Sequence, residues 1–160
     1  MSQFAILRNC VLPLHLYYKI DEHIWMRMEP DGLVTLGFTD VAQTTAGGML
    51  HVTFRQVGKF FPAGKAVAVV ESAKWLGPLR TPVAGMLAAT NESLLEDAGL
   101  INRSPYGRGW VVKMQPQASD GAHDLLVTGE AALAAYEAFM AERDLDDCIH
   151  CEGYELPAQP

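Results

Sequence analysis

The stretch that decides the fold reads Pro62-Ala63-Gly64-Lys65-Ala66-Val67-Ala68-Val69-Val70-Glu71-Ser72-Ala73-Lys74-Trp75-Leu76-Gly77-Pro78. Its apolar run, residues 66–70, is short enough for a buried strand and follows a Pro-Ala-Gly turn signal. Residues 71–78 read as a polar-tipped turn, and β character resumes at residue 79. The pattern predicts a hairpin whose Lys74 extends into water with its amine free. Solvated lysines are common in such turns, so position alone assigns Lys74 no function.

The rest of the chain indicates a mainly β protein. A second hairpin is expected at residues 23–38, around the turn Pro30-Asp31-Gly32, with further strands at 49–54, 83–90 and 110–114. Short helices are expected at 41–46, capped by Asp40, and from Asn91 to residue 98, and a longer helix at 128–143. These elements favour a β-sandwich or flattened barrel with short peripheral helices and a C-terminal helix.

Composition excludes several classes of protein. With 160 residues and 49% hydrophobic content, the chain fits one ordinary domain. Its net charge of −7 disfavours nucleic-acid binding, and we find no basic run that offers a local exception. There is no stretch as long as a membrane helix and no recognisable targeting signal, so we expect a cytoplasmic protein. Three cysteines are too few for a secreted disulfide framework.

The segment Val70-Glu71-Ser72-Ala73-Lys74 resembles the lipoylation hairpin of the glycine cleavage system H protein. The resemblance extends over about residues 18–142. It includes His23-Ile24-Trp25, Val34-Thr35-Leu36-Gly37-Phe38-Thr39-Asp40-Val41-Ala42-Gln43, Val57-Gly58-Lys59, Thr81-Pro82-Val83-Ala84-Gly85, Asn91-Glu92, Leu100-Ile101-Asn102 and Pro105-Tyr106-Gly107-x-Gly109-Trp110. It implies a lipoyl-domain-like β-sandwich, a barrel-sandwich hybrid, over residues 18–143. An N-terminal extension, residues 1–17, and a loose C-terminal tail, residues 144–160, would flank this domain.

The resemblance also implies a role for Lys74. Lipoic acid would join its amine through an amide, which removes the lysine charge and creates a long arm that carries intermediates between enzymes. The chain would then be a carrier and not an enzyme, and its first partner would be a lipoate ligase or another lipoyl-attaching enzyme. Glu71 either helps that enzyme recognise the hairpin or is an ordinary solvated carboxylate.

The chain departs from the family pattern beside the lysine, where Ala73 and Trp75 stand in place of Val and Ala. Trp75 either marks an interface or folds back onto the domain. Acidic residues usual in the family after the glycine at position 47 and near position 53 are missing, which weakens the expectation of glycine decarboxylase binding.

The pattern Lys74-Trp75-x-Gly77-Pro78 is similar to the lipoate-binding proteins of the sulfur-oxidising heterodisulfide-reductase-like pathway. In that branch the arm would carry sulfur to a heterodisulfide-reductase-like complex. We therefore predict a sulfur carrier. The alternative is a glycine cleavage H protein whose arm carries an aminomethyl group.

The end of the chain contains Cys148-Ile149-His150-Cys151. A zinc site normally needs four ligands, and no second pair is present, so we expect no metal. Cys148 and Cys151 could form a small disulfide or exchange with lipoyl sulfurs. Alternatively, they lie in a tail without a function.

No catalytic constellation emerges. In an H-like fold His23 would lie near the carrier's cleft, and His51 is expected to face away from Leu50 and Val52, but both are more typical of structural or surface positions. Two other classes compete with a lipoyl carrier. An unmodified scaffold would use Trp75 and the hairpin as a binding surface, and a biotinyl carrier would have methionines beside its lysine, which this chain lacks. Nothing requires more than a monomer.

Overall fold

The hairpin expected at residues 23–38 forms two neighbouring strands of a seven-stranded sheet. The computed structural model describes residues 3–117 and 126–157. Strand β4 (Ile24–Met28) pairs antiparallel with β5 (Val34–Phe38). The order across the sheet is β12-β3-β4-β5-β11-β10-β7. Its remaining strands are β3 (Tyr17–Lys19), β7 (Phe60–Phe61), β10 (Gly85–Thr90), β11 (Val112–Pro116) and β12 (Val127–Thr128).

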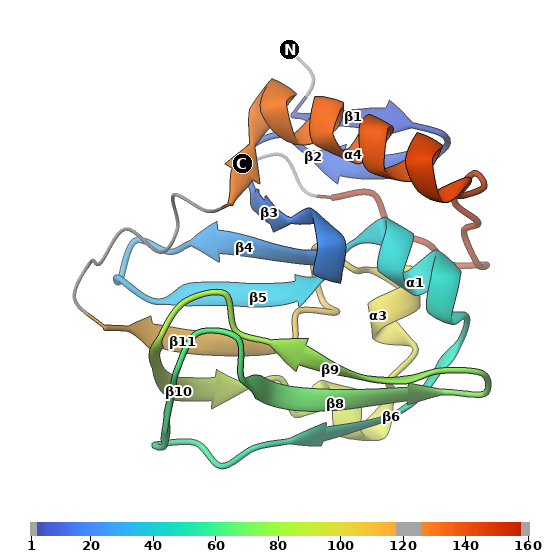
Figure 1. Ribbon diagram of the computed structural model, residues 1–160. Helices are drawn as coiled ribbons and strands as arrows, with labels where there is room; N and C mark the ends of the chain where they lie inside the picture. The colour runs from blue at the N-terminus through green and yellow to red at the C-terminus, as the bar shows by residue number, and fades with distance from the viewer. Residues whose placement is uncertain (1–2, 118–125, 158–160) are drawn as a thin grey trace.

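A three-stranded sheet holds the hairpin that residues 62–78 predict. It has the order β6-β8-β9 and consists of β6 (Met49–Phe54), β8 (Ala66–Ser72) and β9 (Leu76–Arg80). Figure 1 shows it at the lower end of the molecule, beside β10 and β11. Side chains from both sheets share one buried cluster, which includes Leu36, Val67, Val70, Leu79, Leu87 and Met114. Two unclosed sheets packed over one core confirm the predicted lipoyl-domain-like β-sandwich.

Helices cover one side and one end of the sheets. They are η1 (Ile20–Glu22), α1 (Asp40–Ala46), α2 (Ser93–Glu96), α3 (Leu100–Arg103) and α4 (Gly129–Arg143). Helix α4 buries Ala132, Tyr136 and Met140, which recur every four residues along one side. Helix α3 was not expected, because four residues are too few to show a helical period.

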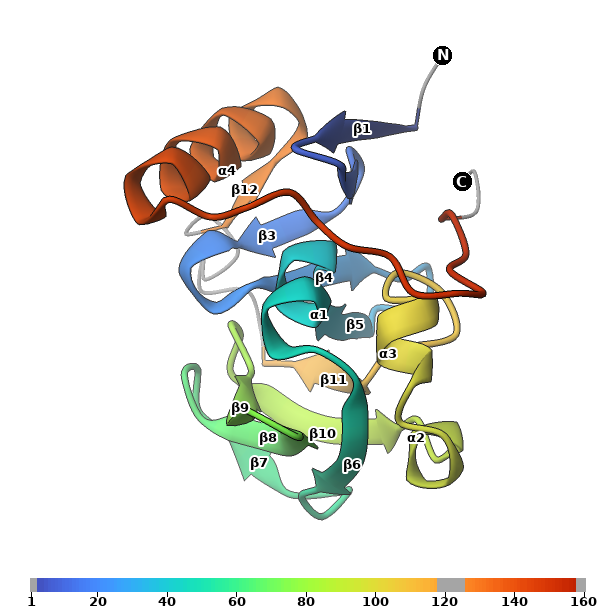
Figure 2. The ribbon, with the colours of Figure 1, turned by 90° about the vertical axis from the view of Figure 1, so that its right-hand side faces the viewer.

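A second buried cluster joins the N-terminal segment to α4. Strands β1 (Phe4–Leu7) and β2 (Cys10–Pro13) form a hairpin that lies against α4 in Figures 1 and 2. Cys10, Leu12 and Leu16 are buried in this cluster with Trp25 and Tyr136. Residues 4–16 therefore pack as part of the same folded unit, and the boundary predicted at residue 17 is not a structural boundary.

Local geometry corrects several predictions. The N-cap of α1 is Thr39 and not Asp40, since the Thr39 side chain accepts a hydrogen bond from the Ala42 amide at 3.3 Å. The alternation of β6 places Leu50 on the same face as Val52, but in the structure Leu50 is exposed and Val52 is buried. A register shift between Met49 and His51 changes the phase of β6 there.

The structure gives one finding about membranes. Over residues 3–117 and 126–157, we find no helix with the length and apolar character needed to cross a bilayer.

Candidate functional site

Lys74 lies at the tip of the β8–β9 hairpin, in a turn of only three residues, 73–75. The strands pair from Ala66 opposite Arg80 to Glu71 opposite Leu76, with a register shift between Ala66 and Ala68, so the pairing is regular from Ala68 almost to the tip. The Ser72 amide donates to the Trp75 carbonyl at 2.8 Å and closes the turn. The Ser72 hydroxyl donates to the Ala46 carbonyl at 2.6 Å, which ties the tip to the end of α1. A rigid base therefore holds an exposed lysine.

The Lys74 side chain lies over Gly47, the C-cap residue of α1. A Cβ atom on Gly47 would be 3.3 Å from Lys74 Cε, and Gly47 has a φ of +78°, which favours glycine. The lysine stem thus lies in a cradle that any side chain at position 47 would narrow. Glycine at position 47 therefore leaves the space beside the lysine stem open.

The same surface opens into a cavity of about 550 Å³ beside Lys74. This volume is within the range of small-molecule sites. Helices α1 and α3, the loop between α1 and β6 and the C-terminal segment form its walls, through residues that include Gln43, Gly48, Asn102, Arg103, Ile149 and Cys151. The sequence gives no signal for this cavity, because its walls beside Lys74 come together from three separate segments of the chain.

Asn102 fixes the wall of the cavity under the lysine. Its Oδ1 accepts from the Met49 amide at 2.8 Å, and its Nδ2 donates to the Gly47 carbonyl at 2.8 Å. The buried amide therefore holds both ends of the Gly47-Gly48 segment. Its role was missed, although it lies in one of the segments that carry the family resemblance.

Trp75 packs against the domain on one side and is exposed on the other, so the structure shows the contact with the domain and leaves an interface role as a prediction. The residue is 37% exposed, and its ring meets the Phe38 ring edge-on at a centroid distance of 6.3 Å. A Cβ on Gly77 would be 2.2 Å from the Trp75 ring, so glycine is required under it. Glu71 is exposed and pairs across the sheet with His51, which is also exposed.

The C-terminal segment is not a loose tail over residues 144–157. This segment, called the strap below, has no helix or strand but crosses α1 and reaches α3 (Figure 2). Cys148 forms a disulfide with Cys10 and not with Cys151, so the small disulfide within the C-x-x-C motif, one of the alternatives left open by the sequence, is not formed. Cys151 is free and exposed, and it lines the cavity beside Lys74.

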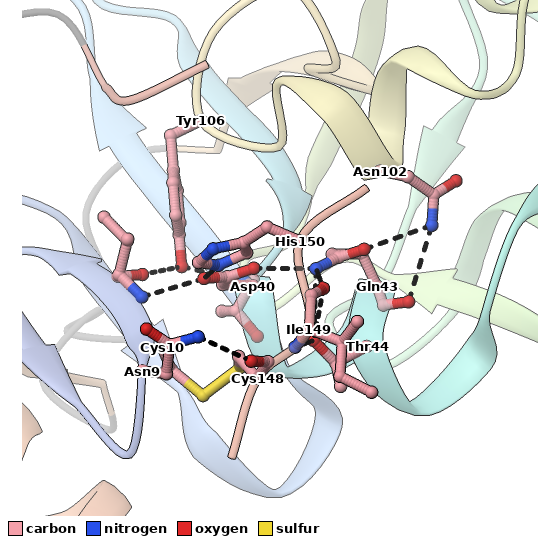
Figure 3. A network of polar contacts seen from close by, with 12 residues as sticks. Asn9, Cys10, Asp40, Gln43, Thr44, Asn102, Tyr106, Cys148, Ile149 and His150 are labelled. Atoms are coloured by element: carbon pink, nitrogen blue, oxygen red, sulfur yellow. Dashed lines mark hydrogen bonds and ion pairs between the residues drawn. A yellow bond between two sulfur atoms is a disulfide. The ribbon is translucent and has the colours of Figure 1, made fainter. Parts of the chain in front are cut away.

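Figure 3 shows the polar contacts that hold the strap. Asn9 Nδ2 donates to the Cys148 carbonyl and Gln43 Nε2 to the Ile149 carbonyl, both at 2.9 Å. His150 Nε2 lies 2.6 Å from Asp40 Oδ2. The sequence gives no signal for these contacts, because each partner is more than 100 residues from the strap.

Asp40 is the buried centre of this network. It is 0% exposed, and its carboxylate accepts from the Val11 amide and from Gln43 Nε2, each at 2.8 Å. Tyr106 links the backbone of Asp40 to β2, since its hydroxyl donates to the Val11 carbonyl at 2.6 Å and accepts from the Asp40 amide at 2.9 Å. A buried carboxylate with this many donors is a structural anchor between β2, α1 and the strap.

His23 lies away from the walls of the Lys74 cavity. Its Nδ1 is 2.8 Å from the Tyr136 hydroxyl, and its ring stacks on Tyr136 and meets the edge of Phe139. Burial lowers the pKa of His23 to about 4, so the imidazole is neutral at pH 7. His23 therefore joins η1 to α4.

Comparison with known proteins agrees with this geometry. A family model described as "Glycine cleavage H-protein" matches residues 16–139. Glycine cleavage system H protein 2 of Aquifex aeolicus is 37% identical over 139 residues, covering 87% of this chain and 86% of the relative. H protein 3 of the same organism is 40% identical over 147 residues, covering 90% and 91%.

A solved structure supports the same relationship. The crystal structure of a glycine cleavage system H protein from Mycobacterium marinum matches with a TM-score of 0.66 and 28% identity, and it covers 84% of this chain and all of that one. These matches agree with the lipoyl cofactor and the noncatalytic carrier role expected from the sequence. The chain belongs to the glycine cleavage H-protein family.

Proposed function

We propose that Lys74 carries the lipoyl group of this protein. The observation that carries this proposal is the exposed lysine at a three-residue hairpin tip, with its stem in the Gly47 cradle. The ladder of β8 and β9 fixes where the arm begins, and the Ser72 contact with α1 keeps that point still. The bound lipoyl group would supply reversible thiol–disulfide exchange. The protein itself supplies a fixed origin and reach.

We propose glycine cleavage as the process served by the arm, with an aminomethyl group as its cargo. The relatives that cover most of this chain are named as glycine cleavage system H proteins, and their lengths match it closely. The partners would be the lipoyl-attaching enzyme and the glycine cleavage enzymes.

A second candidate is the sulfur carrier that the hairpin sequence suggested. The observation that favours it is Cys151, a free thiol in the wall of the Lys74 cavity. A thiol there could exchange with lipoyl sulfurs, as the sequence suggested for the C-x-x-C segment. Cys148 could not, because it forms a disulfide with Cys10. In this candidate the partner would be a heterodisulfide-reductase-like complex.

Mass spectrometry of the chain purified from its native host tests these proposals. We expect a lipoyl increment on the peptide that contains Lys74, and no increment in Lys74→Arg. An aminomethyl adduct on the arm would select glycine cleavage, and additional sulfur would select the second candidate. A bare Lys74 in cells with active lipoylation would contradict the carrier role and favour an unmodified scaffold, in which Trp75 and Glu71 act only as binding surface.

A matched variant tests whether Cys151 takes part. Sulfur loading of the arm should be lower in Cys151→Ser than in the wild type, with the lipoyl increment unchanged. Equal sulfur loading in the two proteins would remove Cys151 from the function.

A further inference from the structure

Charge is divided unevenly along this acidic chain. Residues 41–91 hold five basic side chains, Arg55, Lys59, Lys65, Lys74 and Arg80, and one acidic side chain, Glu71. The remaining residues hold seven basic and 18 acidic side chains. Residues 41–91 contain β6 to β10, so basic side chains outnumber acidic ones on these strands and their connecting loops, whereas the acidic Glu92, Glu96 and Asp97 follow directly in and beside α2.

Three of these basic residues surround one groove at the hairpin end. Arg55, Lys65 and Arg80 are all exposed and line a groove of about 680 Å³. Its other walls include Phe61, Pro62, Val69, Leu76 and Pro78. We call this groove, with its three cations, the basic face. It runs along β9 from Leu76, two residues beyond Lys74, to Arg80 at the far end of the strand.

The cations of the basic face have no acidic partner among residues 3–117 and 126–157. In this part of the chain the one polar side-chain contact of the three is the hydrogen bond that the Arg80 guanidinium donates to the Gly64 carbonyl, at 3.2 Å. Elsewhere in the fold, by contrast, Arg27, Arg103 and Arg108 pair with Glu29, Asp97 and Glu155. Unpaired cations around apolar side chains have the charge and shape to receive an acidic protein surface.

The position of the groove indicates which partner uses it. An enzyme that modifies bare Lys74 must bring Nζ itself into its active site, because the arm is not yet there. It therefore has to cover the hairpin tip, and a standard footprint of about 800 Å² on each partner extends from the tip along β9 to the three cations at the other end of the hairpin. Once the lipoyl group is attached, the arm spans part of the distance to an enzyme's active site. The enzymes that act on the completed arm therefore need less contact with β9.

We propose that the basic face is the docking surface for an acidic face of the lipoyl-attaching enzyme. This inference rests on the proposed lipoylation of Lys74. A protein surface fits better than a nucleic acid or an anionic membrane, because the three cations border a groove with apolar walls, which protein side chains can fill and a phosphate surface cannot.

Lipoylation kinetics with a purified lipoate–protein ligase test the proposal. The test variant is Arg55→Glu with Arg80→Glu. The control is Lys19→Glu with Arg143→Glu, which changes net charge equally but lies on β3 and α4. Arg55→Lys with Arg80→Lys keeps the charge of the basic face. Thermal melts establish that all three variants are folded.

At low salt, kcat/KM for lipoylation should fall about tenfold or more in the charge-reversed variant, mainly through KM. It should remain near the wild-type value in the control and in the lysine variant. The difference should shrink at about 0.5 M salt, where charges are screened beyond a few ångströms.

An unchanged kcat/KM at low salt, or an equal loss in the control, would overturn the docking proposal. Binding to phosphatidylglycerol vesicles that needs Arg55 and Arg80, with an unchanged lipoylation rate, would assign the basic face to lipid and overturn it as well. The end point separates this inference from the proposed function. If every variant is fully lipoylated at the end point, Lys74 stands as the attachment site whatever the rates show. If the wild-type protein stays unmodified, the proposed lipoylation of Lys74 fails.

Discussion

Reduction of the Cys10–Cys148 disulfide should lower the stability of this protein substantially. The two cysteines are 138 residues apart, so the bond closes a loop that includes most of the chain. In the chain-entropy model, opening a loop of this length costs about 5 kcal/mol of unfolding free energy. For a chain of this size, that corresponds to a fall in Tm of roughly 10–20 °C.

The contacts around the disulfide indicate that the fold itself does not depend on the S–S bond. Cys10 and Cys148 are 0% and 3% exposed, and the His150–Asp40 contact continues to hold the strap after reduction. We therefore expect the reduced protein to remain folded. Its free energy of unfolding should be lower because the unfolded chain without the disulfide has more conformational entropy. Because the unfolded chain keeps some compactness, about 5 kcal/mol is an upper value.

Denaturant unfolding, with and without reductant, measures this effect. The oxidised wild type should unfold at a higher denaturant midpoint than the reduced wild type, and Cys10→Ala with Cys148→Ala should match the reduced protein in both conditions. Cys151→Ser is the control, since Cys151 is free and exposed, and its unfolding free energy should stay within about 0.5 kcal/mol of the wild type. Equal midpoints for the oxidised and reduced wild type would refute the reasoning, as would three reactive thiols in the oxidised, denatured protein.

Two further predictions follow from the site and its surroundings. Folding lowers the pKa of His23 from 6.5 to about 4, so on acidification the unfolded chain binds this proton before the folded protein does. The free energy of unfolding should therefore fall by about 3 kcal/mol between pH 6.5 and pH 4. An NMR titration that shows His23 of the folded protein protonating near pH 6.5 would contradict this. Gly47→Ala should slow lipoylation of Lys74 and lower the free energy of unfolding by about 1 kcal/mol, because the added Cβ would crowd the lysine stem and Gly47 has a positive φ. Gly48→Ala is the control and should have neither effect, since the added Cβ would have nothing within 4 Å and Gly48 has no positive φ. Lipoylation rates and urea melts of the two glycine variants check this, and equal rates would remove the cradle from the site.

The predicted strands differ in how well they match the structure. The 23–38 hairpin is confirmed because a Pro-Asp-Gly turn between two alternating segments is a local signal. Leu50 was misplaced because a bulge in β6 changes its phase, and a bulge depends on the partner strand. The turn around Lys74 is shorter than expected, since pairing with β8 draws Leu76 and Gly77 into β9 despite Pro78.

The candidate site divides in the same way. Lys74 could be identified from sequence because the hairpin signal and the family resemblance both lie within a few residues of it. The Gly47 cradle and the cavity could not, since their walls come from segments 43–49, 99–103 and 149–152. The same holds for Cys148, whose partner at position 10 lies at the opposite end of the chain.

The sequence by itself determined the β-rich class, the family and the lysine at the hairpin tip, because periodicity, turn chemistry and contiguous motifs are local properties. Only the tertiary structure decided that the strap is ordered, that Trp75 folds onto Phe38, and that Cys151 rather than Cys148 lies beside the lysine. Each of these depends on contacts between residues far apart in the chain. Such contacts form only when burial of apolar side chains brings the two sheets, α4 and the strap together.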